Sequence, residues 1–427
     1  MNLRNKVYWL KDSLLGHGIM KRSYNDVKRS FEEGIENEEQ LSSILKWATE
    51  EVPFYKQYAG KRFEEFPVVN KNVIKEGGDN FMATCMKGLK LHEERTSGST
   101  GSPFTIFQDS QKRIRAAADS LVFSEMAGFK LGTRLYYVRV WNHLNKKSTL
   151  QCLMQNIVMQ ESDNLSDDAL DSWLKAMEKD GSEKSVLGYA SSLVALEKWM
   201  TRTNRKTSAK VQCFITMSET MPQDSKRQLM KLFDCPVISR YSNQECGLMS
   251  QQCIGGDEYH INTRSFYIEI LDLEKDIPVA DGIKGRIVVT DLFNRSMPLI
   301  RYDTGDIGAI SHKSHCGKPG KVLTSVEGRK VDCFYSTKGE LLSPVSIINA
   351  MWEYNDLLQY QFIQNGQKEY EIKLNSTTPT YAREEEVVQE MKRIVGDDAF
   401  IKVTYVDEIP LLKSGKRKQV VNNYKSI

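Results

Sequence analysis

The sequence predicts an α/β protein in which a large N-terminal domain with mixed sheets and helices precedes a small C-terminal α+β domain. Three observations predict this arrangement: helical periodicity near the N-terminus, β-rich runs that alternate with helical segments in the middle, and a helix, hairpin, helix, strand order at the C-terminus. A chain of 427 residues has room for more than one domain and a large hydrophobic core.

The large domain is expected to begin with a helical part, residues 1–65, because apolar side chains such as Leu41, Ile44 and Leu45 recur there at helical spacing. A further helix is predicted over 113–129. β-rich runs follow at 136–141, 211–216 and 236–241, with a helix over 224–233 and mainly antiparallel strands at 265–273 and 285–292. The alternation favours an α/β core.

The C-terminal part forms a compact set of its own. A helix is predicted after Ser343-Pro344, a hairpin with Asn365-Gly366 at its turn, a helix over 382–395 and a strand over 401–409. This order is typical of a ferredoxin-like domain. We therefore place the boundary after residue 328, with 1–328 as the large domain and 329–427 as a small mobile domain.

The amino-acid composition limits the kinds of binding partner that the protein is expected to have. Lys and Arg (59) nearly balance Asp and Glu (56), and a net charge of +3 argues against a dedicated nucleic-acid or polybasic membrane binder. Charged residues interrupt every apolar run of the N-terminal segment, which predicts neither a signal peptide nor a membrane span. We expect a cytoplasmic protein with small-molecule partners, in which the eight Cys are buried apolar side chains or metal ligands.

A loop rich in Ser, Thr and Gly is the first candidate site, at RTSGSTGSPFTIFQD (95–109). Its backbone N–H groups and hydroxyls suit the oxygens of a polyphosphate. No Lys follows Gly101, so the loop is not a P-loop of the G-x-x-x-x-G-K-[ST] kind. A flexible surface linker is the alternative.

Three further motifs carry carboxylates or a guanidinium. Glu245 in YSNQECG follows a predicted strand and suits Mg²⁺, although a surface Glu is the alternative. Asp306 in RYDTGD can accept hydrogen bonds from ribose hydroxyls, or belong to an ordinary Asx turn. Arg329 in GRKVD lies at the predicted domain boundary, where a charged linker is the alternative, and the run 410–421 can be a solvated basic tail.

The order of these motifs is more specific than any one of them. T-S-G-S-T-G, Y-x-x-x-E, Y-x-T-G-D, G-R-x-x-D and a late G-K resemble the core motifs of the adenylate-forming superfamily, which contains acyl-CoA synthetases and adenylation domains. The segments 66–81, 187–199 and 215–221 are similar to the phenylacetate–CoA ligase branch and its CapK-like relatives of capsular polysaccharide biosynthesis. The resemblance covers nearly the whole chain.

The resemblance implies a role for each matching residue. In that superfamily a carboxylate attacks the α-phosphorus of ATP and expels pyrophosphate, and a nucleophile then displaces AMP from the acyl-adenylate. Lys416 is the expected catalytic cation, acting with Glu245 as the magnesium ligand, and Asp332 is the expected hinge. The expected nucleotide-binding residues are Thr96, Ser97, Gly98, Ser99, Thr100 and Gly101 at the phosphates, Ser218, Glu219, Thr220, Tyr241 and Ser242 around the adenine, and Asp306 with Arg329 at the ribose.

The chain departs from the superfamily pattern in places. Phe104 stands where many members have a Lys after the Pro of the loop, and Ser242 and Gln244 replace the commoner Gly and Thr before the magnesium Glu. Lys413 and Lys418 flank Lys416, so the register of the late motif is open. These differences concern nucleotide contacts and leave the implied reaction class unchanged.

A structural zinc site is a further implication of the resemblance. Cys253 and His260 follow the Glu motif, while Cys316 follows the Asp motif together with His315 and His312. Cys253, His260, Cys316 and one of the two later His, with His315 preferred, supply a four-coordinate donor set that suits Zn²⁺. Unrelated surface His and buried Cys are the alternative.

We therefore predict an enzyme, an ATP- and magnesium-dependent AMP-forming ligase with coenzyme A as the acyl acceptor. The alternatives are an amine acceptor in surface polysaccharide assembly and a non-catalytic nucleotide-binding protein. Tyr137, Trp141 and Asn142 are expected to line the pocket for the carboxylic acid. Trp141 and Tyr137 suit an aromatic or small apolar acid, whereas Arg139 and His143 suit a polar one. The identity of the acid and the formation of a homodimer are left open.

Overall fold

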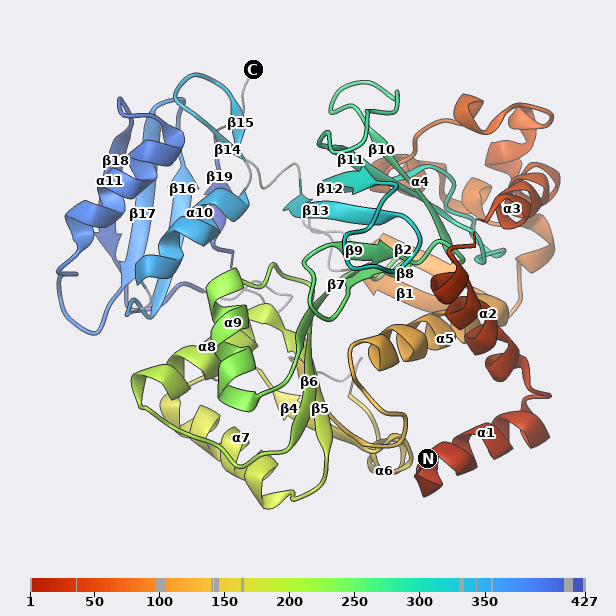
Figure 1. Cartoon of the computed structure of the whole chain (residues 1–427). Helices are drawn as coiled ribbons and strands as arrows, with labels where there is room; N and C mark the ends of the chain where they lie inside the picture. Colours follow the sequence, from red (N-terminus) through yellow and green to blue (C-terminus); the bar gives the residue numbers. More distant parts are fainter. Residues whose placement is uncertain are drawn as a thin grey trace. The chain divides into compact units, whose positions relative to one another are not determined.

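The structure is a computed structural model, which describes residues 2–35, 37–96, 104–139, 141, 146–162, 165–329, 334–342, 344–354, 356–410 and 418–424. The chain divides into two compact units. The first unit contains Met1–Arg134, Gln212–Ser218 and Ile238–Val326, and the second contains Leu135–Val211, Glu219–Val237 and Glu327–Ile427. Large mixed sheets with helices, and a separate C-terminal sheet, confirm the predicted fold class (Figure 1).

Helices make up the N-terminal part of the first unit. They are α1 (Leu3–Leu15), α2 (Ile19–Glu33), α3 (Glu38–Glu51), α4 (Lys71–Gly77) and α5 (Ser110–Met126). Helix α2 ends at Gly34, whose φ of +68° is a left-handed conformation that glycine adopts without strain. Asp109 caps α5 by accepting a hydrogen bond from the backbone N–H of Lys112 at 2.9 Å. Helices α2 and α5 pack together through Val27, Val122 and Phe123.

The strands of the first unit lie in the order β10 (Phe266–Leu271), β11 (Gly285–Asp291), β12 (Tyr302–Ser311), β13 (Val322–Arg329), β9 (Tyr259–Ile261), β8 (Gly247–Gln252), β7 (Val237–Asn243) and β6 (Val211–Met217). Strand β11 pairs antiparallel with β10, as the sequence predicted, and it also pairs antiparallel with β12. A separate hairpin joins β1 (His92–Thr96) to β2 (Phe104–Gln108). Apolar side chains of α3, α4, β2 and β11 form the core, among them Ala48, Ile74, Ile106 and Ile287.

The second unit contains a parallel segment and a C-terminal sheet. The parallel segment has the order β5 (Lys184–Tyr189), β3 (Arg134–Arg139) and β4 (Ile157–Glu161), accompanied by α6 (Thr149–Gln155), α7 (Asp167–Lys179), α8 (Ala190–Arg202) and α9 (Gln223–Phe233). Strands β5 and β3 approach closely at Gly188, where an added Cβ would lie 2.8 Å from the Cβ of Val138. Glycine is therefore needed at this position.

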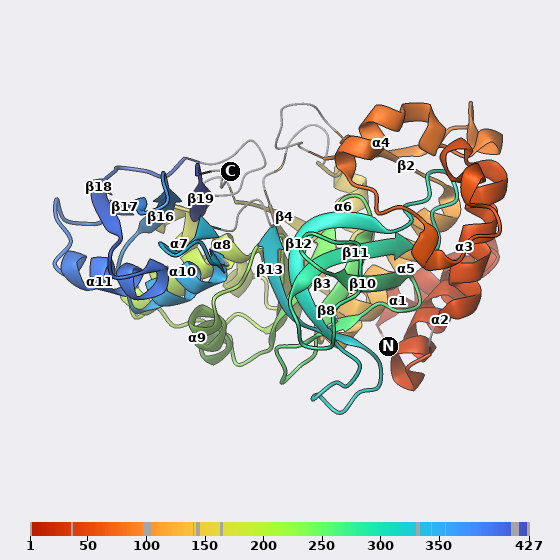
Figure 2. The same cartoon turned by 90° about the horizontal axis from the view of Figure 1, so that it is seen from above.

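The C-terminal sheet has the order β18 (Phe400–Tyr405), β17 (Glu369–Asn375), β16 (Gln359–Gln364) and β19 (Val420–Asn422). Helices α10 (Pro344–Ala350) and α11 (Glu384–Val395) cover one face of it, as Figure 2 shows. Helix α11 begins with three Glu and ends with Lys392 and Arg393, a distribution that the helix dipole favours. The predicted helix, hairpin, helix and strand are all present. Among the described residues, no helix has the length and hydropathy needed to span a membrane.

Candidate active site

Tyr241 and Asp306, two residues predicted to bind the nucleotide, are in direct contact in the first unit. The Tyr241 hydroxyl donates a hydrogen bond to Asp306 Oδ2 at 2.7 Å and lies 3.2 Å from Thr304 Oγ1. Burial and then the charge of Asp306 hold the pKa of the Tyr241 hydroxyl well above its ordinary value. The hydroxyl is thus a permanent donor that orients the Asp306 carboxylate.

Local backbone features explain this placement. Strand β7 carries a bulge between Tyr241 and Ser242 where it pairs with β8. In β12, Gly305 has a φ of +80°, and its N–H donates to Asp303 Oδ1 at 2.8 Å. The Asx turn is therefore made by Asp303, while the Asp306 carboxylate faces Tyr241.

Glu245 is buried, with a side chain only 3% exposed. This excludes the alternative of a surface Glu. The Tyr302 hydroxyl donates to Glu245 Oε1 at 3.1 Å, and Lys71 Nζ forms an ion pair with the same oxygen. Burial and then the charge of Glu245 raise the pKa of Tyr302, so its hydroxyl also stays protonated. A carboxylate oxygen is a ligand that Mg²⁺ prefers, and Lys71 occupies this oxygen of Glu245 in the structure.

A second buried cation supports the turn that carries Glu245. Lys112 Nζ donates to the Cys246 carbonyl at 2.7 Å and forms an ion pair with Asp291 Oδ2 at 2.6 Å. The Asn243 side chain accepts a hydrogen bond from the Cys246 backbone N–H at 2.7 Å. Burial raises the pKa of the Cys246 thiol well above its ordinary value, so this thiol is inert at neutral pH. Hydrogen bonds to both the carbonyl and the N–H group of Cys246 therefore hold the turn that carries Glu245.

Sequence reasoning missed both Lys71 and Lys112. Lys71 belongs to the segment 66–81 that carried the resemblance to the phenylacetate–CoA ligase branch, and its place in that segment was the available signal. Lys112 carries no such signal, because it lies on the regular helix α5. Its burial against Asp291 depends on tertiary packing.

The residues predicted to edge the adenine follow β6. Ser218 has a φ of +68°, an uncommon conformation for a residue with a side chain and one that concentrates at functional sites. In the second unit, Glu219 Oε2 accepts a hydrogen bond from the Ser191 backbone N–H at 2.9 Å, near the start of α8. The geometry gives Glu219 a capping contact, and the adenine role of Ser218, Glu219 and Thr220 stays a prediction.

Predicted pocket residues of the second unit surround an arginine. The guanidinium of Arg139 lies 5.5 Å from the ring centres of both Tyr137 and Trp141, whose rings meet edge-on. Burial raises the pKa of Tyr189, and the charge of Arg139 opposes that effect, which places Tyr189 in the same group. Aromatic faces around a guanidinium can receive the carboxylate end of a small acid.

Several predicted residues lie outside the described part of the chain: Ser97, Gly98, Ser99, Thr100, Gly101, Asn142, Asp332 and Lys416. Thr96 and Arg329 are described by their backbone alone, at the ends of β1 and β13. The predicted roles of all these residues stay predictions.

Three of the predicted zinc ligands come together in the first unit. The donor atoms of Cys253, His260 and Cys316 lie within 4.8 Å of one another, and His260 Nε2 is 2.8 Å from Cys316 Sγ. Burial and then the charge of Lys318 lower the pKa of His260 to about 4, so its imidazole is neutral at pH 7. Two sulfurs and a neutral imidazole suit Zn²⁺.

His315, the preferred fourth ligand, does not join this group, and neither does His312. His315 Nδ1 lies 2.6 Å from Glu258 Oε1, its backbone N–H donates to the same carboxylate, and its side chain is 85% exposed. His312 Nδ1 lies 2.8 Å from the Asp281 carboxylate. The nearby Ser314 Oγ is instead 3.1 Å from His260 Nε2. The prediction of a His as fourth ligand is therefore not met in this structure.

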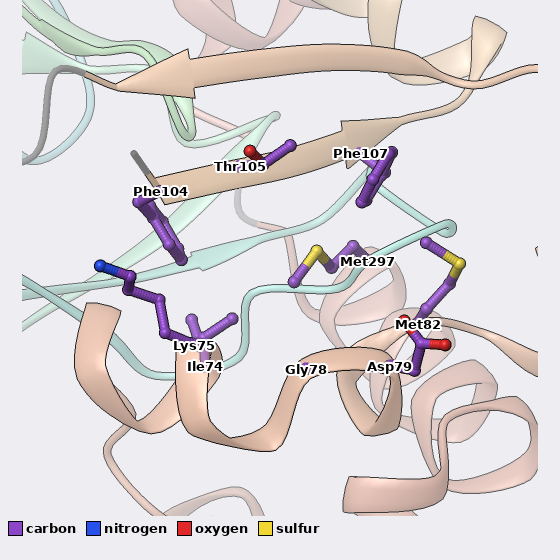
Figure 3. Close-up of a pocket in the computed structure, with 9 residues that line it drawn as sticks. All are labelled: Ile74, Lys75, Gly78, Asp79, Met82, Phe104, Thr105, Phe107 and Met297. Carbon is purple, nitrogen blue, oxygen red and sulfur yellow. The ribbon is translucent and has the colours of Figure 1, made fainter. Parts of the chain in front are cut away.

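A pocket of about 300 Å³ opens in the first unit between α4 and β2 (Figure 3). It is lined mainly by apolar side chains of α4, the following turn and β2: Ile74, Lys75, Gly78, Asp79, Met82, Phe104, Thr105, Phe107 and Met297. None of the predicted site residues that the structure describes lines it. Phe104 connects the pocket with the site, because its ring centre lies 5.7 Å from Lys71 Nζ.

The fold of this chain is similar to that of solved acyl-CoA ligases. The structure is similar to 2-hydroxyisobutyryl-CoA ligase in the postadenylation state with R3-HIB-AMP, at a TM-score of 0.69 and 15% identity, over 94% of this chain and 88% of that chain. It is also similar to ATP-bound MatB from Rhodopseudomonas palustris, at a TM-score of 0.54 and 16% identity, over 76% and 66%. The chain has the fold of the adenylate-forming ligases.

Similarity in sequence points to a narrower group of relatives than similarity of fold does. Residues 334–423 match the family model of the CapK C-terminal domain. Protein CapK of Staphylococcus aureus is 22% identical over 378 residues, which cover 84% of this chain and 80% of that protein. The resemblance to the adenylate-forming superfamily and its CapK-like branch is confirmed.

Proposed function

We propose that the protein activates a carboxylic acid with ATP and Mg²⁺ through an acyl-adenylate, and transfers the acyl group to coenzyme A. The contact between Tyr241 and Asp306 carries this proposal, because it joins two motifs predicted to bind one nucleotide although they lie far apart in sequence. The similar solved ligases contain ATP, acyl-AMP or coenzyme A, which supports the same reaction class.

The reaction has two steps. A carboxylate oxygen of the acid attacks the α-phosphorus of ATP, the bond to pyrophosphate breaks, and the acyl-adenylate forms. The thiolate of coenzyme A then attacks the acyl carbon, and AMP leaves. Because the first step joins two anions, positioning and positive charge supply most of the catalysis.

Each residue has a place in this scheme. Asp306, oriented by Tyr241, accepts the ribose hydroxyls. Glu245 holds Mg²⁺, which supplies positive charge to the phosphates. Lys416 offsets the charges of the acid and the α-phosphate during the first step. Arg139 with Tyr137 and Trp141 receives the acid, which favours a small acid with a flat or apolar body.

Zinc has a structural role in this proposal. Cys253, His260 and Cys316 supply three ligands, and the fourth is a water or the nearby Ser314 hydroxyl. Zinc bound there would tie Cys253, which follows β8, and His260 in β9 to Cys316 in the loop after β12.

An amine acceptor is the second candidate. The similarity to CapK favours it, because the CapK-like branch is the one that we associate with capsular polysaccharide biosynthesis, where an amine of a sugar or an amino acid can be the acceptor. An amino sugar or an amino acid would then capture the acyl-adenylate as an amide.

Pyrophosphate release tests the proposal. Wild type and Asp306→Asn are assayed with ATP and Mg²⁺ over a panel of small carboxylic acids, each with coenzyme A, with an amine or with neither. Release that depends on one class of acid and falls in Asp306→Asn supports adenylation, and the acceptor that accelerates turnover identifies the second step. Binding of ATP without release for any acid would favour the non-catalytic alternative.

A further inference from the structure

We propose that Lys71 is a phosphate-binding residue that exchanges its ion pair with Glu245 for the β- and γ-phosphates when ATP and Mg²⁺ bind. The inference rests on the proposed function and adds a residue to it. Lys71 is the first residue of α4, and Asn70 caps this helix by accepting hydrogen bonds from the N–H groups of Asn72 and Val73 at 2.9 and 3.1 Å. The cap fixes the Lys71 backbone, and the side chain extends to Glu245.

Glu245 needs a cation in the resting protein. Its side chain is 3% exposed, and an unpaired buried carboxylate is strongly unfavourable. Tyr302 supplies a neutral hydrogen bond only. Lys112 is held by Asp291 at 2.6 Å and by the Cys246 carbonyl at 2.7 Å, so its charge is already balanced. Lys71 therefore neutralises Glu245.

Lys71 differs from Lys112 in being able to move. Its side chain is 34% exposed, whereas the Lys112 side chain is 1% exposed. A lysine carries its charge on a flexible four-carbon stem with three donors. When Glu245 binds Mg²⁺, repulsion between the two cations drives the ammonium away from the carboxylate. The phosphates that arrive with the metal are anions to which the ammonium can transfer.

The position of Lys71 relative to the Ser/Thr/Gly loop supports this exchange. The hairpin β1–β2 pairs Thr96 with Phe104, and the chain between these two residues is the predicted phosphate loop. Lys71 Nζ lies 5.7 Å from the ring centre of Phe104, the first residue of β2 and the residue that follows the predicted loop in the sequence. Position 104 carries no charge in this chain, and Lys71 supplies a cation from α4 instead.

The exchange is tested by comparing the binding of ATP, which has β- and γ-phosphates, with that of AMP, which has neither. Calorimetry at constant ionic strength measures the affinities of wild type, Lys71→Met and Lys71→Arg for ATP with Mg²⁺ and for AMP. We expect Lys71→Met to weaken ATP binding about tenfold or more, since a charge-assisted phosphate contact is lost. AMP has no β- or γ-phosphate, so its affinity should change less than twofold. Lys71→Arg should retain most of the affinity for ATP. Lys46→Met, in an exposed pair with Glu50, is the control.

A second variant separates binding from folding. Lys71→Met leaves Glu245 buried without its cation and should lower the melting temperature, whereas Lys71→Met with Glu245→Gln should restore it. An unchanged affinity of Lys71→Met for ATP would overturn the inference, and so would equal losses for ATP and AMP, which indicate a structural role. Failure of wild type to bind ATP would overturn the proposed function itself, and the inference with it.

Discussion

At the residue scale, one hydrogen bond joins Tyr241 to Asp306, the two residues that we propose to bind the adenine and the ribose. The hydroxyl orients the carboxylate before any ligand arrives, at 2.7 Å. We expect Tyr241→Phe to retain the aromatic ring that we propose to lie along the adenine, and to weaken ATP binding by about 1 kcal/mol because Asp306 loses one donor. Equilibrium binding of ATP measures the change, and Tyr8→Phe on α1 is the control. Unaltered affinity would mean that the contact has no part in nucleotide binding.

Some residues of the candidate site could be predicted from the sequence, and others could not. Glu245 and Asp306 were found because their motifs have a fixed order along the chain. Lys71 and Lys112 were missed because their meaning comes from the partners that folding brings to them, Glu245 and Asp291. His315 lies outside the group of Cys253, His260 and Cys316 in this structure, because proximity in sequence to Cys316 does not show where a side chain points, and its ring pairs with Glu258.

At the element scale, Asp26 ties α2 to α5 and to the turn before β10. Its carboxylate accepts hydrogen bonds from Arg115 at 2.7 Å and from Arg264 at 2.9 Å. Burial acts to raise the pKa of Asp26, but the hydrogen bonds of Arg264 and Arg115 outweigh it and hold the pKa below the ordinary value of 3.8.

Stability should therefore depend on Asp26 at neutral pH. We expect Asp26→Asn to lower the free energy of unfolding by about 1–2 kcal/mol at pH 7. Since the folded-state pKa is depressed, this contribution is present above pH 3.8 and is lost as the pH falls through the folded-state pKa below it. Denaturant unfolding at pH 7 and under acid measures it. Glu32→Gln, in an exposed pair with Lys28, should change stability little. A pH-independent loss in Asp26→Asn would contradict this account.

A further prediction at the element scale concerns zinc. It rests on the group formed by Cys253, His260 and Cys316 in the first unit. We expect about one equivalent of zinc in the purified protein, and a lower melting temperature after chelation, because metal binding is coupled to folding. Cys316→Ser should lose the metal, while Cys85→Ser, at an exposed Cys, should keep it. Less than half an equivalent of zinc in wild type, by elemental analysis, would count against the site.

Whole elements were predicted more reliably than their ends. The helix expected over 113–129 is α5, Ser110–Met126, and the strand expected over 285–292 is β11, Gly285–Asp291. Hydrophobic periodicity reports which face of an element is buried, whereas caps such as that of Asp109 decide where a helix begins. Topology, including the position of β9 between β13 and β8, arises from long-range pairing that no local pattern shows.

At the scale of the whole molecule, the fold and the motif order lead to the same class of reaction by separate routes. The small net charge of +3 fits small-molecule partners, and the fold is shared with ligases that contain ATP or acyl-AMP. In the proposed function, side chains such as Arg139 and Trp141, whose guanidinium and ring centre lie 5.5 Å apart, select the substrate acid locally. Relatives with the same fold can therefore act on different acids.

Acid-dependent exchange of labelled pyrophosphate into ATP is the most direct test of the central claim, because only a reversible adenylation step produces it. We predict exchange in wild type with one class of acid, and a fall of about a hundredfold or more in Lys416→Ala, since the cation that offsets the reacting anions is removed. Lys418→Ala, two residues along, should retain exchange. Exchange that is absent with every acid, or that survives in Lys416→Ala at the wild-type rate, would contradict the account.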